Sequence, residues 1–334
     1  MSQAANLALS GLTKTYGPAL AVDNVTLRIA TGEMVALLGP SGCGKTTTLR
    51  MIAGLVEPTK GKIVIGGHDV TRVPVHRRNI GMLFQNYALF PHLTVAQNIA
   101  FGLEMRRLPR AETSRRVQAA LDLVQLPQMA ERLPAALSGG QQQRIALARA
   151  LVIEPSVLLL DEPLGALDKG LRESMQVELR LLQRRLGITT VIVTHDQEEA
   201  LTLADRIVIM RNGRLEQVGT PHEIYARPKT RFVAAFIGAA NFLHSGTPGT
   251  AIALRPEAIR IDPAPAEATP TSRPATIDQV IYRGALTHLH LRLDDGQPLL
   301  AYHPNQARDG ATFTSGCRVQ ISWSEGDTHQ VSDL

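Results

Sequence analysis

Four short segments of this chain are almost continuously apolar or β-branched, and longer amphipathic stretches separate them. They are residues 35–38, 157–160, 190–194 and 207–210. Runs of this kind are typical of strands whose two faces are both buried, as in a parallel sheet. Helix-like segments alternate with them, for example from Lys45 to about Ala53. The pattern therefore predicts an α/β domain with a mostly parallel sheet.

The pattern changes between residues 104 and 133. Apolar positions there recur at helical spacing among charged residues, as at Val117, Leu121 and Val124. This spacing predicts an amphipathic helical insertion between strands of the sheet.

The last third of the chain has a different pattern. Leucines alternate with His and Arg over residues 288–293, and this period of two predicts a half-buried strand that ends in a turn at 295–296. Residues 262–276 are rich in Pro, Ala and Thr and are interpreted as a loop. We therefore expect two domains, a large α/β domain at 1–235 and a small, mostly β domain at 236–334.

Composition narrows the class of protein. The 334 residues are 44% hydrophobic and 19% charged, which excludes a disordered chain. No apolar run approaches the length of a membrane helix, and the N-terminus lacks the pattern of a secretory signal. Two cysteines cannot form a disulfide framework. We expect a soluble, cytoplasmic protein, whose net charge of +5 suits phosphate ligands, nucleic acid or an anionic membrane.

The clearest chemical motif is GPSGCGKT at residues 39–46, which fits the phosphate-binding pattern G-x-x-x-x-G-K-[ST]. It follows a predicted strand and precedes a predicted helix. The alternative, a glycine-rich turn that fits the pattern by chance, would not require this context. Backbone amides can then surround phosphate oxygens, while Lys45 reaches the β- and γ-phosphates and Thr46 ligates Mg²⁺. The residues expected to bind nucleotide here are Gly39, Pro40, Ser41, Gly42, Cys43, Gly44, Lys45, Thr46 and Thr47.

Two carboxylates end the predicted strand VLLLDE, at residues 157–162. Asp161 can hold Mg²⁺ through water beside the phosphate loop, and Glu162 is placed to polarise an attacking water. Many strands end in acidic residues, so this assignment depends on the phosphate loop in the same α/β pattern.

A second anion site is predicted at Ser138, Gly139, Gly140 and Gln141, just before a helical run. Ser138 is a good N-cap, and the two glycines leave amides open to an anion. One nucleotide cannot need both sites of one domain, so we expect two copies of the chain to share nucleotides. The alternative is an ordinary capped helix.

Together these motifs resemble the nucleotide-binding subunit of an ATP-binding-cassette (ABC) importer over residues 1–235. In that family Tyr16 would stack on adenine, Gln85 would contact Mg²⁺ and water and sense the membrane subunit, and His195 would contact the γ-phosphate. Segment 138–141 would be the signature that closes over the partner's ATP, and residues 166–168 would meet the partner chain. Each residue alone is more often structural; the resemblance lies in their joint order and spacing.

The resemblance implies a P-loop NTPase cassette with a mostly parallel core sheet, an antiparallel β part and a helical subdomain at about residues 86–155. It implies an ATPase that binds ATP and Mg²⁺. The chain would form a homodimer at the cytoplasmic face of the inner membrane, peripheral to two permease subunits and served by an extracytoplasmic solute-binding protein. Catalysis would fall to Glu162, His195 and Gln85, and metal binding to Thr46, Gln85 and Asp161.

Residues 236–334 resemble the small OB-like (TOBE) regulatory domain of such importers, through LRPE at 254–257 and the strand at 280–293. Residues 84–112 are most similar to the polyamine branch, which implies import of spermidine or putrescine. Ferric ion, sulfate, phosphonate and sugars are alternative cargoes. A soluble cassette ATPase acting on ribosomes or nucleic acid is a further alternative, which the scattered aromatic residues of the tail argue against; no nucleic-acid partner is expected.

Overall fold

The computed structural model describes residues 4–165, 167–262, 272–305 and 313–333. The chain divides into two compact units, Met1–Pro221 and His222–Leu334. Composition places the domain boundary later, at 235/236. The stretch between the two positions contains the short helices α7 (Pro221–Ala226) and α8 (Arg231–Phe236).

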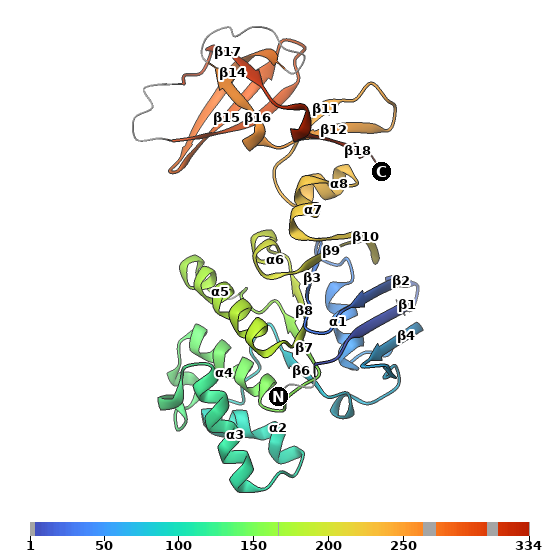
Figure 1. Cartoon of the computed structure of the whole chain (residues 1–334), viewed down its shortest axis with the longest axis vertical. Helices are drawn as coiled ribbons and strands as arrows, with labels where there is room; N and C mark the ends of the chain where they lie inside the picture. The colour runs from blue at the N-terminus through green and yellow to red at the C-terminus, as the bar shows by residue number, and fades with distance from the viewer. Residues whose placement is uncertain (1–3, 166, 263–271, 306–312, 334) are drawn as a thin grey trace. The chain divides into compact units, whose positions relative to one another are not determined.

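The core of the first unit is a six-stranded sheet in the order β10-β9-β3-β8-β7-β6 (Figure 1). All neighbouring strands are parallel except β9 and β10. Every residue of β3, β7 and β8 is buried, which confirms the strands expected from continuous apolar runs. The strands are β3 (Met34–Leu38), β6 (Ile80–Leu83), β7 (Val157–Asp161), β8 (Thr189–Thr194), β9 (Arg206–Arg211) and β10 (Arg214–Gly219).

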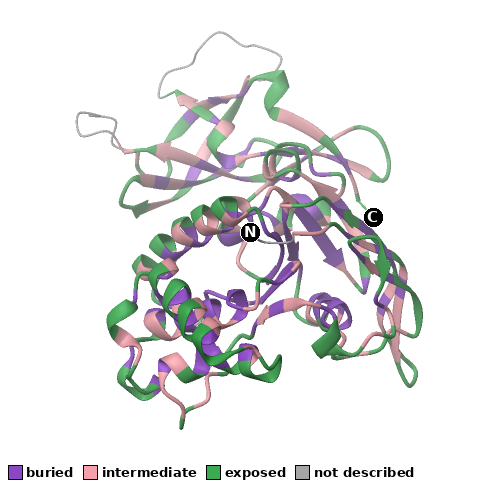
Figure 2. Ribbon diagram, turned by 60° about the horizontal axis from the view of Figure 1, so that its bottom comes forward, coloured by how far each residue is buried: buried purple, intermediate pink, exposed green. Residues whose placement is uncertain are grey.

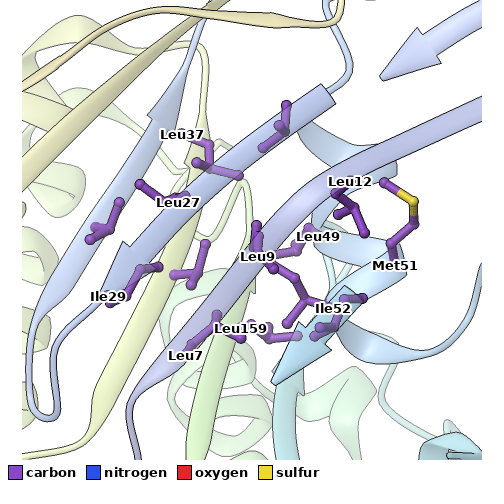
Figure 3. Packing of buried hydrophobic residues seen from close by; sticks show 14 of the residues in the cluster. Leu7, Leu9, Leu12, Leu27, Ile29, Leu37, Leu49, Met51, Ile52 and Leu159 are labelled. Atoms are coloured by element: carbon purple, nitrogen blue, oxygen red, sulfur yellow. The ribbon is translucent and has the colours of Figure 1, made fainter. Parts of the chain in front are cut away.

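A second, antiparallel sheet has the order β2-β1-β4-β5. Helix α1 (Lys45–Ala53) begins and ends where the sequence predicts. One hydrophobic cluster joins this helix to both sheets, and Figure 3 shows Leu49 and Ile52 of α1 with Leu9 of β1 and Leu159 of β7. The strands are β1 (Leu7–Tyr16), β2 (Ala19–Ile29), β4 (Lys60–Ile65) and β5 (His68–Asp69).

A helical part is inserted between β6 and β7 and has a hydrophobic cluster of its own. It contains α2 (Val95–Met105), α3 (Arg110–Leu123) and α4 (Gly139–Leu151). The sequence predicts this helical insertion, and the structure confirms it. Asn98 is fully buried and donates to the carbonyl oxygens of Phe90, Leu93 and Thr94, so it fixes the segment that leads from β6 into α2.

Two further helices flank the parallel sheet, α5 (Lys169–Leu186) and α6 (Gln197–Leu203). Buried residues fill the central strands between the helices (Figure 2). In the part of the chain that the structure describes, none of the helices is both long and apolar enough to span a membrane.

The β part of the second unit consists of a three-stranded sheet, β11-β12-β18, and a five-stranded sheet, β13-β17-β14-β15-β16. Both are antiparallel, and one hydrophobic cluster around Trp323 holds residues of both. The strands are β11 (Asn241–His244), β12 (Thr250–Leu254), β13 (Arg260–Asp262), β14 (Ser272–Arg283), β15 (Leu286–Leu293), β16 (Pro298–Pro304), β17 (Arg318–Ser322) and β18 (Thr328–Ser332).

The predicted half-buried strand is β15, in which Leu289, Leu291 and Leu293 are buried. The interpretation of residues 262–276 as a loop is wrong in part, because Ser272–Arg283 is strand β14 and Asp262 ends β13; residues 263–271 lie outside the described residues. Pro274 fits in β14 because it pairs only with β17, and pairing with β15 begins one residue later.

Arg255 ties α7 and α8 to the β part of the second unit. Its guanidinium donates to the carbonyl oxygens of Tyr225, Ala234 and Ala239 at 2.8 to 3.0 Å. It also lies 4.1 Å from the centroid of the Tyr225 ring, whose hydroxyl donates to Glu257 at 2.6 Å. The LRPE motif noted in the sequence thus has a structural task, which is to satisfy backbone carbonyls at the ends of two short helices.

A second arginine, Arg78, holds the end of α1. The side chain is 5% exposed, and its guanidinium donates to the carbonyl oxygens of Met51, Ile52, Thr71 and Val73. Burial lowers the pKa of this guanidinium from its usual value. Four carbonyl partners replace the water that the buried cation loses.

Replacing Arg78 with Met should therefore destabilise the first unit by about 3 kcal/mol, because four carbonyls lose a charged donor. Urea unfolding of the full chain, followed by circular dichroism, would measure this. Arg77→Met is the matched control, because Arg77 is exposed. Equal unfolding midpoints for the two variants would contradict the role given to Arg78.

Candidate nucleotide-binding site

The phosphate-binding motif forms the turn between β3 and α1. Close backbone packing requires glycine at two of its positions: a Cβ added at Gly39 would lie 2.3 Å from the carbonyl oxygen of Met210, and one at Gly44 would lie 2.5 Å from that of Ala21. Gly44, with φ of 101°, is the N-cap of α1 and makes no side-chain cap. The first amides of α1 are therefore left for an anion, as the motif predicts.

The Lys45 ammonium lies inside this turn. Its Nζ donates to the carbonyl oxygens of Gly39 at 2.7 Å and Pro40 at 2.9 Å, and the side chain is 7% exposed. Cys43 is buried next to Lys45. Burial raises the pKa of its thiol, and this effect outweighs the lowering effect of Lys45. Pro40, Ser41 and Gly42 form the exposed rim of the loop, and Thr47 is half-buried beside it.

Asp161 is the last residue of β7 and is buried against the loop. Burial raises the pKa of its carboxyl, while a hydrogen bond from Thr46 and the charges of Arg50 and Lys45 act in the opposite direction. A hydroxyl and a carboxylate side by side suit Mg²⁺, which takes few protein oxygens and completes its shell with water and phosphate. In the described ranges, no group of three or more His, Cys, Asp or Glu side chains could hold a metal ion.

Three of the predicted site residues, which follow three neighbouring strands, lie close together. Gln85 follows β6, Glu162 follows β7 and His195 follows β8, and these three strands are neighbours in the sheet. The Gln85 Nε2 donates to the Glu162 Oε2 at 2.9 Å, and the His195 Nδ1 lies 3.3 Å from the Glu162 Oε1. Glu162 has φ of 46°, and its amide donates to Val193 at 2.9 Å, so the backbone itself aims this carboxylate.

Tyr16 ends β1 and is 50% exposed. It pairs with Ala19 in the hairpin whose second strand carries Ala21, the residue packed on Gly44. The hairpin therefore places an accessible ring next to the phosphate loop. Lys14 lies 4.9 Å above that ring and donates to the carbonyl oxygen of Glu57 at 2.8 Å.

The segment 138–141 forms the N-terminus of α4 in the helical part, whereas α1 lies between the two sheets (Figure 1). Ser138 and Gln141 form a reciprocal capping box: Gln141 Oε1 accepts from the Ser138 amide at 3.0 Å, and Ser138 Oγ accepts from the Gln141 amide at 3.4 Å. The N-cap predicted at Ser138 is confirmed. The amides of Gly139 and Gly140 make no contact with that cap.

Sequence reasoning missed the residues that support this site. Arg149 of α4 donates to the carbonyl oxygens of Tyr87 at 2.8 Å and Ala88 at 2.9 Å. Both acceptors have positive φ, so this arginine holds an unusual turn just after Gln85. Of the segment 166–168, Leu167 is buried and Asp168 caps α5, while Ala166 lies outside the described residues.

A buried carboxyl, Glu199, lies beneath His195. The side chain is 2% exposed, and its Oε2 accepts from the Thr194 hydroxyl. Its Oε1 has no hydrogen-bond partner among the described residues. Burial raises the pKa of Glu199 to about 7. The only sequence signal was the pair Asp196 and Glu199 at capping-box spacing.

Family models and individual relatives match the chain in both parts. A model described as "ABC transporter" matches residues 22–165, and one described as "TOBE domain" matches residues 252–331. The spermidine/putrescine import ATP-binding protein PotA of Thermobifida fusca is 47% identical over 95% of this chain and 91% of its own. The sulfate/thiosulfate import ATP-binding protein CysA of Thermosynechococcus vestitus is 51% identical over 89% of this chain and 90% of its own.

Solved structures give the same result for the first unit. A dimeric post-hydrolysis structure of the ATP-binding cassette MJ0796, bound to ADP and Pi, matches with a TM-score of 0.58 and 35% identity over 64% of this chain and 98% of that one. CbiO1 of Clostridium perfringens matches with a TM-score of 0.61 and 32% identity over 65% of this chain and 89% of that one. These comparisons confirm the expected fold class of a cassette followed by a small β domain.

The raised pKa of Glu199 makes stability depend on pH. Its folded pKa of about 7 exceeds the ordinary value of 4.5, so the protonated carboxyl stabilises the fold below about pH 4.5. This contribution is lost as pH rises through 7. From about pH 5 to about pH 8, the melting temperature of the wild type should therefore fall relative to that of Glu199→Gln.

Glu198→Gln is the control for this measurement, because Glu198 is exposed on the same helix. Its melting temperature should follow that of the wild type at every pH. A difference between the wild type and Glu199→Gln that does not vary with pH would refute the assignment.

Proposed function

Since the chain belongs to the ABC transporter family, we propose that it is the ATP-hydrolysing subunit of a membrane importer and that its cargo is a polyamine such as spermidine or putrescine. The observation that carries the ATPase role is the contact of Glu162 with both Gln85 and His195, at the ends of three neighbouring strands beside the phosphate loop. The polyamine assignment is supported by the relatives named for spermidine and putrescine import.

Each residue has a distinct part in this proposal. The loop amides, Lys45 and the dipole of α1 bind the phosphates, and Tyr16 stacks on the base. Thr46, Asp161 and Gln85 would hold Mg²⁺, which would neutralise charge on the phosphate oxygens. Glu162 takes the proton of the attacking water, and His195 both orients Glu162 and contacts the γ-phosphate.

Two copies of the chain act together. Residues Ser138, Gly139, Gly140 and Gln141 of one copy close on the γ-phosphate bound by the other. The amides of Gly139 and Gly140, which the capping box does not use, form a second anion site that a single chain does not need. ATP binding closes the dimer, and hydrolysis removes the phosphate that bridges the copies. The alternation drives two permease subunits at the cytoplasmic face of the membrane, and a solute-binding protein on the other side delivers the cargo.

Sulfate is the second candidate cargo, because the sulfate/thiosulfate importer subunit is 51% identical. The relatives named here are import proteins, which gives a ribosome- or nucleic-acid-directed ATPase no support. The cargo itself would be selected by the permease and the binding protein.

Replacing Glu162 with Gln should lower the rate of ATP hydrolysis about a hundredfold or more. ATP binding should stay intact, because only the proton acceptor is lost. The bound ATP should then trap a dimer that light scattering can detect. The exposed Glu173 offers a control variant, Glu173→Gln, which should hydrolyse ATP at the wild-type rate. A Glu162→Gln protein with wild-type turnover would overturn the role given to Glu162.

Uptake of labelled putrescine, spermidine and sulfate by cells that lack this chain would test the cargo. The cells would be complemented with the wild type or with Glu162→Gln. We expect only the wild type to restore polyamine uptake, with sulfate uptake unchanged. Restoration of sulfate uptake alone would replace the polyamine assignment and retain the ATPase role.

A further inference from the structure

The first turn of α5 lies against the signature segment of the same chain. A Cβ added at Gly140 would lie 3.1 Å from the Cδ2 of Leu171, and one at Gly139 would lie 3.8 Å from the Cδ2 of Leu167. Two leucine side chains therefore lie against the glycine pair at the start of α4, in which Gly140 is buried and Gly139 is exposed. Protein interiors are close-packed, so a displacement of this glycine pair must be passed to the start of α5.

Arg172 follows directly in that turn and joins two other segments. Its Nη2 donates to the carbonyl oxygen of Leu167 at 2.8 Å, and its Nη1 lies 3.4 Å from the Asp196 Oδ2. Its Nε is buried and has no hydrogen-bond partner in the described part of the chain. One terminal nitrogen of the guanidinium thus contacts the segment that contains Leu167, and the other contacts the segment that contains Asp196.

Asp196 determines the position of His195. It is the residue after His195, and its carboxylate caps α6 by accepting from the Glu199 amide at 3.1 Å. The Asp196 amide donates to the Thr194 hydroxyl at 2.9 Å. The backbone on both sides of His195 is therefore fixed by a small network that Arg172 enters through Asp196.

Arg172 differs from Arg180, another arginine of α5, in the segments that its contacts join. Arg180 also pairs with an acidic residue, Asp205, but that contact joins α5 to the start of β9, away from Glu162 and His195. The two acceptors of Arg172 lie instead in the segments that follow Glu162 and His195. A single guanidinium thus connects the segments that follow Glu162 and His195, and the Glu162 Oε1 and His195 Nδ1 atoms lie 3.3 Å apart.

We propose that Arg172 is a positioning residue that couples the signature segment 138–141 to the contact of His195 with Glu162. This inference rests on the proposed function, in which the signature segment binds the nucleotide held by the second copy. When that segment closes, Leu167 and Leu171 shift the first turn of α5, and Arg172 carries the shift to Asp196. Hydrolysis in one site thereby responds to the nucleotide in the other.

The test is the steady-state ATPase rate of the full chain as a function of ATP concentration. We expect Arg172→Met to lower kcat about tenfold or more, to leave KM within about twofold, and to remove cooperativity in ATP. Arg172→Lys should recover part of kcat, because an ammonium can still bind one of the two acceptors. A purely structural role would change the melting temperature without this separation of kcat from KM.

Arg184→Met is the matched control, because Arg184 is exposed near the end of the same helix. It should leave kcat, KM and cooperativity unchanged. If Arg172→Met fails to fold, Asp196→Asn removes the same link from the other side and should give the same loss of kcat and cooperativity. Variants that keep kcat within twofold and retain cooperativity would overturn the proposal.

Dimer formation is measured separately, so that a failure of the proposed function can be distinguished from a failure of the coupling role of Arg172. ATP-dependent dimerisation is measured by light scattering for Glu162→Gln with and without Arg172→Met. Dimers in both proteins, together with the loss of cooperativity above, support the coupling. No dimer in Glu162→Gln alone would count against the proposed function itself. A dimer that Arg172→Met abolishes would instead make Arg172 an interface residue and overturn its coupling role.

Discussion

Complete burial of three strands, β3, β7 and β8, determines where this chain can carry charge. A strand that is covered on both faces cannot hold charged residues along its length without leaving them desolvated. Its charged residues must come where the chain leaves the sheet, and parallel strands leave it at the same edge. Lys45, the adjacent pair Asp161 and Glu162, and His195 come from distant parts of the sequence and lie close in space for this reason.

The same reasoning explains how far the sequence could predict the molecule. Continuous apolar runs located the core strands, and the phosphate-loop motif located α1, because burial and backbone geometry both leave local signals. The contact of Gln85 and His195 with one carboxylate depends on loops between distant strands, including the left-handed backbone of Glu162, and such loops carry no periodicity. The sequence predicts a loop over part of strand β14 because proline and threonine are frequent there, and only the pairing register shows that Pro274 is tolerated.

Three arginines that bind backbone carbonyl oxygens account for part of the basic composition. Arg78, Arg149 and Arg255 each bind backbone carbonyl oxygens, and burial lowers the pKa of all three guanidinium groups. Their charge is used inside the fold, where it satisfies helix ends and an unusual turn. Part of the net charge of +5 therefore has a structural cause. The sequence does not predict such residues, because a backbone carbonyl acceptor can belong to any type of residue.

The contacts of Arg255 also bear on where the chain can be divided. A shortened protein that ends at residue 235 would keep α7 and most of α8 but would lose the guanidinium that satisfies Tyr225 and Ala234. Unsatisfied carbonyls at two helix ends favour fraying and expose the apolar side chains beneath. Division at Pro221 and His222 leaves that network whole on one side. The two pieces made there are the ones suited to separate expression and to exchange between related subunits.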